Sequence, residues 1–421
     1  MKIPANQLSL DFKNNGKKEF PYEHILPKIV NISENFNVWE VDQTISQLSY
    51  LTHNYFRYYG KFPSTVASQL VKEFASGKNC AVLDNYSGSG TTLVEASRRS
   101  VFSVGIDISP IAALAGVVKT DIYCCDSLKR TTSDLKKKFG QMPTCLPEDI
   151  PSKWIEKWFT PEAASDLEKI RALIKSMGNT KNATFFTIAF LAIIRRVSMA
   201  FDGEVRPHIN RDKKQRLVWE AFEKKCKDMI ERQIEFNAAH PDRIVAKVFA
   251  TDSSNNYSNI LPDHNYKLVI SHPPYLNCFD YIQVFSQEFQ WSLGLPCVWT
   301  QTTFEKFYDE ERTNEIKTTV RKPEDVSGYY EKLRQAYEIT HAIQPKGGTC
   351  AIVVGDCKIK SKVEPVHQNL IDIVKSVGYS LSSINYRETH YATGKYSYDF
   401  RADYHSESAE KRDAILIFKK P

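Results

Sequence analysis

Short, continuously apolar runs that end in turn residues constrain the fold of this chain more than any other feature. They alternate with segments of helical periodicity, which is the pattern of a mostly parallel sheet covered by helices on both faces. We therefore predict an α/β fold with a doubly wound, seven-stranded sheet. The seven runs are 81–84, 103–107, 246–252, 267–271, 349–356, 380–386 and 413–418.

The segment between the second and third runs has a different character. Its apolar residues recur at helical spacing with charges between them, as in WEAFEKKCKDMIERQIEF. The segment TSDLKKKFGQMPTCLPEDIPSKW carries a lysine run and three prolines, and we read it as a boundary loop. We predict a helical insertion over 121–245 that divides the catalytic domain into 1–120 and 246–421. Target recognition is our interpretation of the insertion, and a structural cover over one sheet face is the alternative.

Composition fits a folded protein of the cytoplasm. Of the 421 residues, 42% are hydrophobic and 25% are charged, and the net charge of +6 suits a polyanionic partner. The most apolar stretch, 183–194, is too short to span a bilayer, so we expect no membrane association. The nine cysteines form no C-x-x-C pair and the first residues are polar, which favours reduced thiols and no metal site.

The segment AVLDNYSGSGTTLVEA is the strongest chemical signal. An apolar strand ends at Asp84, passes through a small-residue turn over 87–90 and enters a helix at Thr91. Glycine lets the backbone approach a ligand closely, and the first N–H groups of a helix are free to bind an anionic group. The turn lacks the end of a P-loop and the spacing of the dinucleotide fingerprint. It predicts a nucleotide-like cofactor, and a tight turn without a ligand is the alternative.

Two further strand ends carry functional residues. The next strand ends at Asp107, followed by Ile108, where a carboxylate of such folds accepts hydrogen bonds from ribose hydroxyls. A later strand opens into His272-Pro273-Pro274-Tyr275. Two prolines fix the backbone and leave carbonyls as rigid acceptors beside an aromatic face, which is suited to holding an amine. A rigid turn whose tyrosine merely packs is the alternative.

These motifs together resemble the DNA amino-methyltransferases that make N4-methylcytosine or N6-methyladenine. DNYSGSGTT resembles their cofactor motif, although Asn85 and Tyr86 replace its usual Pro-Phe, and THNYFRYYGKFPSTVASQLV resembles the motif that closes over the methionine end of the cofactor. The resemblance implies a Rossmann-like methyltransferase sheet and S-adenosyl-L-methionine as cofactor. The cofactor-binding residues that it implies are Tyr59, Lys61, Phe62, Pro63, Asp84, Ser87, Gly88, Ser89, Gly90, Thr91, Asp107, Ile108 and Asp252.

The resemblance also implies direct methyl transfer to a base amine, without a covalent enzyme intermediate. In this interpretation the carbonyl of Pro273 and the side chain of His272 accept the N–H bonds of the amine, and Tyr275 stacks on the base. The base is flipped out of double-stranded DNA because it cannot be reached inside the duplex. His272 departs from the usual Ser, Asp or Asn before the two prolines.

The sequence leaves the identity of the substrate open. The Leu-Asn-x-x-Asp-Tyr continuation resembles that of family members that modify cytosine, and this resemblance favours cytosine N4 over adenine N6. The chain could instead methylate an RNA base or serve as a non-catalytic DNA-binding subunit, and a cognate restriction enzyme or other defence partner is a candidate partner. Residues expected to line the DNA path are Arg195, Arg196, Arg206, Lys213 and Lys214 in the insertion, and Arg387, Tyr391, Lys395, Tyr396 and Arg401 near the end.

Overall fold

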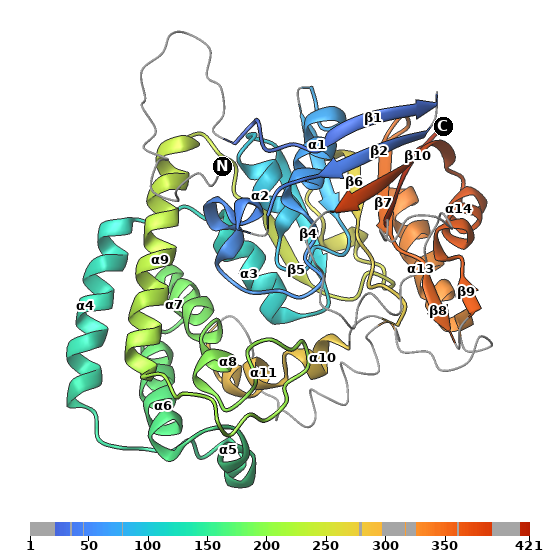
Figure 1. Cartoon of the computed structure of the whole chain (residues 1–421). Coiled ribbons are helices and arrows are strands. Elements are labelled where there is room, and N and C mark those ends of the chain that lie inside the picture. Colours follow the sequence, from blue (N-terminus) through green and yellow to red (C-terminus); the bar gives the residue numbers. More distant parts are fainter. Residues whose placement is uncertain are drawn as a thin grey trace, which may run out of the picture.

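A single large sheet organises the molecule (Figure 1). The computed structural model describes residues 22–33, 36–44, 46–77, 79–277, 280–296, 316, 326–359, 362–389 and 413–421. Within these ranges the sheet has nine strands, in the order β1-β2-β10-β11-β7-β6-β3-β4-β5. Their bounds are β1 Lys28–Ser33, β2 Phe36–Val41, β3 Cys80–Asp84, β4 Phe102–Asp107, β5 Lys247–Ala250, β6 Asn265–Ser271, β7 Thr349–Val354, β10 Ser380–Thr389 and β11 Asp413–Lys419.

The predicted α/β fold is confirmed, because all seven predicted strands lie in this sheet. Strands β3 to β7 are mutually parallel, and β11 is antiparallel to both of its neighbours, β7 and β10. Parallel strands place their carboxyl ends at one edge of a sheet, where open α/β folds bind ligands. Strand β5 is shorter than its predicted range, 246–252, and β10 is longer than its predicted range, 380–386.

The prediction of seven strands is wrong in one respect, because a hairpin extends the sheet. Strands β1 and β2 pair antiparallel, and β2 runs parallel to β10. The Asn37 side chain donates a hydrogen bond of 2.8 Å to Oδ1 of Asn385, far along the chain. Most residues of β1 are exposed to solvent. An exposed strand does not need a continuous run of apolar residues, and the sequence KIVNIS has none. The pattern used to find the other strands therefore misses it.

Alternate residues of the central strands enter two cores. Val82 of β3 packs with α1 (Ser64–Phe74), while Ala81 and Leu83 point to the opposite face and pack with α13 (Ser327–Ile343) and α14 (Val366–Val377). This alternation is the period of a strand buried on both faces. The sheet is thus the middle of three layers. Helices α2 (Thr91–Ser97) and α3 (Pro110–Thr120) follow β3 and β4, respectively. Strands β8 (Cys357–Ile359) and β9 (Lys362–Glu364) form a separate hairpin.

Helices between β4 and β5 project to one side of the sheet (Figure 1). They share a core with α3 and with the pair α10 (Tyr281–Val284) and α11 (Ser286–Ser292). The lysine run that we read as a loop lies in α4 (Cys125–Gln141), because its apolar residues Leu128 and Leu135 pack on that core. The remaining helices of the insertion are α5 Ser152–Trp158, α6 Pro161–Ser176, α7 Lys181–Leu191, α8 Ile194–Val197 and α9 Val218–Ala239.

Within the described ranges, no helix has the length and hydropathy needed to cross a bilayer. The apolar stretch over 183–194 is largely α7, whose side chains fill the core of the insertion. The seven cysteines that the structure describes are free thiols.

Candidate functional site

The turn between β3 and α2 requires glycine at two positions. Gly88 and Gly90 adopt φ angles of 49° and 83°, which favour glycine. A Cβ on Gly90 would lie 2.8 Å from the Cα of Gly116, and one on Gly88 would lie 3.0 Å from Cε1 of Tyr58. The turn therefore packs closely on α3 behind it and on the loop around Tyr58 in front of it.

Two strand ends place carboxylates beside the turn, with Asp84 buried and Asp107 partly exposed. Asp84 Oδ1 accepts the N–H of Tyr86 at 3.1 Å, and Asp107 accepts the N–H groups of Gly88 at 2.8 Å and Ser109 at 2.9 Å. Burial raises the pKa of Asp84 to about 7 and that of Asp107 to about 6. These carboxyls are fixed by backbone donors, and no lysine or arginine bonds to them in the described part of the chain.

A buried lysine supports the turn from behind. Lys119, at the end of α3, is inaccessible to solvent, and its Nζ donates to the carbonyl of Ser89 at 2.7 Å and to its hydroxyl at 2.8 Å. Burial lowers the pKa of Lys119 well below the usual range. Sequence reasoning missed this residue, because it lies 30 positions after its partner in an ordinary helix.

A buried ionic network lies under α2, close to the predicted cofactor loop. Glu95 accepts hydrogen bonds from Tyr50 at 2.5 Å and Arg98 at 2.6 Å, and lies 2.8 Å from Nε2 of His53. Burial opposes ionisation of Glu95, but these partners outweigh it and lower its pKa. Lys61 donates to the carbonyl of His53 at 3.0 Å, and burial lowers the pKa of Lys61 to about 8. The loop that carries Lys61 is thus fixed to the helix that follows the turn.

The His-Pro-Pro-Tyr segment follows β6 directly. The His272 ring stacks on Phe62 with a centroid separation of 5.1 Å, and its Nε2 lies 3.2 Å from the Tyr275 hydroxyl. The Tyr329 hydroxyl donates to the carbonyl of Pro274 at 3.0 Å. Tyr275 is 8% exposed and packs against Gly355, where an added Cβ would lie 3.2 Å from its ring. The segment is held by aromatic side chains from two other parts of the chain, Phe62 and Tyr329.

One pocket brings together most of the residues predicted from the sequence. It lies at the carboxyl edge of the parallel strands and reaches from the glycine turn to the proline pair. The predicted residues that line it are Lys61, Phe62, Asp84, Ser87, Gly88, Ser89, Thr91, Asp107, Ile108, Asp252, His272 and Pro274.

The remaining predicted residues, Tyr59, Pro63, Gly90, Pro273 and Tyr275, do not line this pocket. Pro63 and Gly90 precede the first turns of α1 and α2. Tyr59 directs its hydroxyl to Arg195, which donates to it at 2.8 Å.

Neighbouring residues that the sequence did not single out complete the lining. Tyr58 stacks on Tyr281 at 5.4 Å and on Phe285 at 5.2 Å, which makes an aromatic wall. The aromatic run before Gly60 and the Asp280-Tyr281 pair were signals for this wall, but they do not say which ring faces the pocket. The unassigned lining residues are Tyr58, Gly60, Tyr86, Ser109, Ser253, Tyr281, Ile282, Phe289 and Ile316.

The expected DNA-contacting role is wrong for three of the basic residues. Arg195 and Arg387 are buried, and Arg387 forms an ion pair with Asp413. Lys213 donates to the carbonyls of Arg195 and Ala200 and to Asp202. Arg196, Arg206 and Lys214 are exposed. Tyr391, Lys395, Tyr396 and Arg401 lie outside the described residues.

The described residues contain no group of three or more side chains suited to holding a metal ion. The side chains that line the pocket include carboxylates, hydroxyls, aromatic rings, Lys61 and His272.

Comparison with known proteins identifies relatives of this chain. M.BsoBI of Geobacillus stearothermophilus, a type II methyltransferase, is 23% identical over 356 residues, which cover 75% of this chain and 65% of the relative. The chain is similar to type II methyltransferases. M.MvaI of Kocuria varians is 29% identical over 169 residues, covering 37% of this chain and 36% of the relative.

A third type II methyltransferase, M.MjaII of Methanocaldococcus jannaschii, is 33% identical over 126 residues, covering 28% of this chain and 23% of the relative. No family model matches the chain. The match to this chain thus spans 65% of the length of M.BsoBI and smaller shares of the two further relatives. These relatives confirm the family resemblance inferred from the motifs.

Proposed function

We propose that this chain transfers a methyl group from S-adenosyl-L-methionine to an exocyclic amine of a base in double-stranded DNA, with cytosine N4 as the favoured acceptor. The observation that carries the proposal is that one pocket is lined both by the glycine turn and by His272 and Pro274. A cofactor site and an amine-accepting site in one cavity suit direct transfer between two bound molecules. The similarity to type II methyltransferases supports the same activity.

The residues around the turn fit this cofactor. The carboxylates of Asp107 and Asp252 are acceptors for its ribose hydroxyls and adenine, and Gly88 of the turn lines the same pocket. Lys61 and Phe62 come from the loop assigned to its methionine end. When bound, the cofactor supplies an electrophilic methyl group on a sulfonium.

His272 and the proline pair would hold the target amine. The lone pair of an exocyclic amine is delocalised into the ring, so the nitrogen is a weak nucleophile until acceptors take its N–H bonds. We assign these acceptor roles to the carbonyl of Pro273 and to the unprotonated nitrogen of the neutral His272 ring. The Tyr275 hydroxyl is 3.2 Å from His272 Nε2, so we assign Tyr275, besides the proposed stacking on the base, the positioning of that ring.

Recognition of DNA is assigned to the insertion over 121–245. Its exposed cations, including Arg206 and Lys214, would neutralise phosphates of a duplex from which the base is flipped. A cognate restriction enzyme or other defence partner is the proposed protein partner.

Incorporation of a labelled methyl group into nucleic acid tests the proposal directly. Purified protein is incubated with labelled cofactor and either duplex DNA or RNA, and the product nucleosides are identified by mass spectrometry. We expect N4-methylcytosine from DNA alone. N6-methyladenine would correct the base, a product from RNA alone would reverse the substrate, and tight DNA binding without methylation would favour a non-catalytic subunit.

A further inference from the structure

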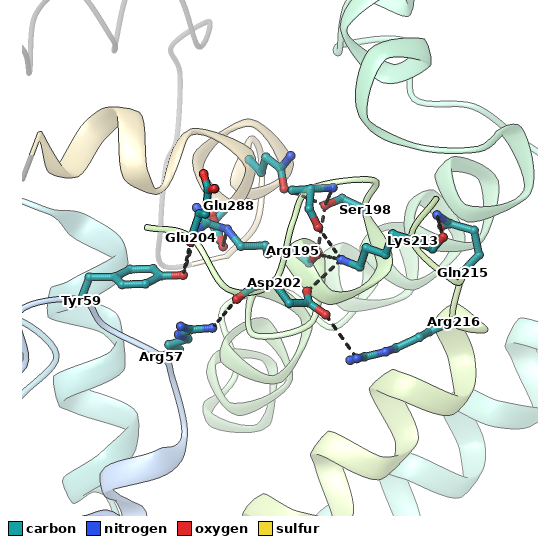
Figure 2. Close-up of polar contacts among 12 residues, drawn as sticks. Arg57, Tyr59, Arg195, Ser198, Asp202, Glu204, Lys213, Gln215, Arg216 and Glu288 are labelled. Carbon is teal, nitrogen blue, oxygen red and sulfur yellow. Dashed lines mark hydrogen bonds and ion pairs between the residues drawn. The ribbon is translucent and has the colours of Figure 1, made fainter. Parts of the chain in front are cut away.

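Arg195 lies where three separate segments of the chain meet (Figure 2). It belongs to α8 and is 7% exposed. Its Nη1 donates to the hydroxyl of Tyr59 at 2.8 Å and to the carbonyls of Val205 at 2.7 Å and Glu204 at 3.3 Å. Its Nη2 donates to the carbonyl of Val284 at the end of α10. One planar guanidinium therefore bonds to all three segments.

A buried carboxylate near Arg195 offsets part of the cost of burying its positive charge. Glu288 of α11 is also buried, with Oε1 3.9 Å from Nε of Arg195. Burial raises the pKa of Glu288, and the guanidinium partly offsets this shift. A fork of several donors has no equivalent in lysine, whose ammonium is a point charge. The site thus depends on the geometry of arginine as well as on its charge.

Two of the three segments form walls of the pocket. The residues around Tyr59 line it, as do Tyr281 and Ile282 of α10 and Phe289 of α11. Tyr59 and Val284 do not line the pocket themselves. Arg195 therefore bonds to both walls on the side that faces away from the pocket.

The third segment is the loop over 199–217, between α8 and α9. Lys213 fixes its inner side by donating to Asp202 at 2.8 Å, and Arg57 donates to the carbonyl of Asp202 at 3.1 Å (Figure 2). Its outer side exposes Arg206, Lys214 and the apolar side chain of Phe201. Basic and apolar side chains exposed together suit contact with a nucleic acid groove.

We infer that Arg195 is a positioning residue that couples the loop over 199–217 to the walls of the cofactor pocket. DNA held by the outer side of the loop would thereby alter the affinity for the cofactor, and by reciprocity the cofactor would alter the affinity for DNA. This inference rests on the proposed function for the identity of both ligands. The coupling itself rests on the hydrogen bonds of Arg195, and the bonds of Arg57 to Asp202 and of Tyr59 to Glu204 join the first segment to the loop directly.

Hydrogen exchange on the protein alone tests the coupling. Arg195→Met removes the shared donor, and Arg196→Met removes a neighbouring exposed cation from the same helix turn. We expect Arg195→Met to accelerate exchange in 56–62, 199–212 and 281–289 together, and Arg196→Met to leave all three at wild-type rates. Faster exchange in the loop alone would overturn the inference. If Arg195→Met does not fold, Arg195→Lys retains the charge beside Glu288 and is subject to the same criterion.

Ligand titrations test its consequence. We expect Arg195→Lys to weaken cofactor binding about tenfold, because the pocket walls that the guanidinium no longer holds must be ordered when the cofactor binds. In the wild-type protein, duplex DNA should change the Kd for the cofactor, so the ratio of Kd values with and without DNA should differ from one. This ratio should approach one in Arg195→Lys and keep its wild-type value in Arg196→Met. An unchanged ratio in Arg195→Lys would contradict the inference. A wild-type protein that binds no cofactor would refute the proposed function, and the exchange experiment would still decide the coupling.

Discussion

The backbone N–H of Gly88 donates a hydrogen bond of 2.8 Å to Oδ2 of Asp107. This bond joins the turn after β3 to the end of β4, so the turn and the strand-end carboxylate hold each other in place. The second oxygen of Asp107 accepts the N–H of Ser109 at 2.9 Å. A carboxylate fixed by two backbone donors can present its remaining lone pairs to a ligand without losing side-chain entropy on binding.

The glycine turn should not tolerate a side chain at Gly90. An alanine there would adopt a φ of 83° and place Cβ 2.8 Å from the backbone of Gly116. We expect Gly90→Ala to lower the free energy of unfolding by about 1–3 kcal/mol and to weaken cofactor binding in calorimetric titration. Gly140→Ala in α4 is the matched control, because no atom lies within 4 Å of its added Cβ. Unchanged cofactor affinity in Gly90→Ala would count against the site.

Asp84 should make stability depend on pH. Burial raises its pKa to about 7, whereas an unfolded chain ionises Asp near pH 4. Between these values the unfolded state binds fewer protons, so this group lowers stability as the pH rises. Urea unfolding should show Asp84→Asn gaining stability relative to wild type between about pH 4 and pH 7, by at most about 1.4 kcal/mol per pH unit.

Asp134→Asn, on an exposed position of α4, should show no such gain and serves as the control. A difference between Asp84→Asn and wild type that is independent of pH would mean that Asp84 is already ionised in the folded protein near pH 5.

The sequence was informative wherever burial imposes a continuous pattern. The seven predicted strands are readable from their apolar residues, and the motifs at the ends of the parallel ones converge because parallel strands end at one edge. The sequence did not show which of two neighbouring, chemically similar residues faces the pocket or the solvent. Tyr58 faces the pocket and Tyr59 does not, and Arg195 is buried beside the exposed Arg196. Such choices depend on helix and loop orientations that only the packed structure sets.

His272 should be required for the rate of methyl transfer more than for cofactor binding. Loss of one aimed polar group in an active site lowers the rate about 100-fold or more, so we expect such a loss in His272→Ala in single-turnover assays. His272→Asn, which retains a side-chain acceptor, should keep measurable activity. His264→Ala, before the opposite end of β6, should transfer at the wild-type rate. A normal rate in His272→Ala would exclude the acceptor role.

Arg387 should contribute to stability, since its ion pair with Asp413 is buried between β10 and β11. Arg387→Met leaves the Asp413 carboxylate, 1% exposed, without this cation. We expect a loss of about 3–5 kcal/mol in denaturant unfolding. The partly exposed pair of Arg334 and Glu331 is the comparison, and Arg334→Met should cost less than about 1 kcal/mol. Equal losses would show that the Arg387 pair is solvated.

Arg206 and Lys214 should contact phosphates if the insertion binds DNA. Each neutralised phosphate contributes about 0.9 to the slope of log affinity against log salt concentration. The double variant Arg206→Met, Lys214→Met should therefore reduce this slope by about 1.8 in filter-binding titrations over a range of salt concentrations. Lys375→Met on α14, away from the insertion, should leave the slope unchanged (Figure 1). An unaltered slope in the double variant would place DNA recognition elsewhere.

The pairing of β2 with β10 has a consequence for biosynthesis. Asn37 and Asn385 meet across this pair although 348 positions separate them in the chain. At about 5–20 residues per second, Asn37 is translated roughly 17–70 s before its partner. During that interval the edge of β2 that will bond β10 stays open, and an open strand edge is a site for association with other chains. Chaperone occupancy of nascent chains should therefore persist until the last strands have left the ribosome.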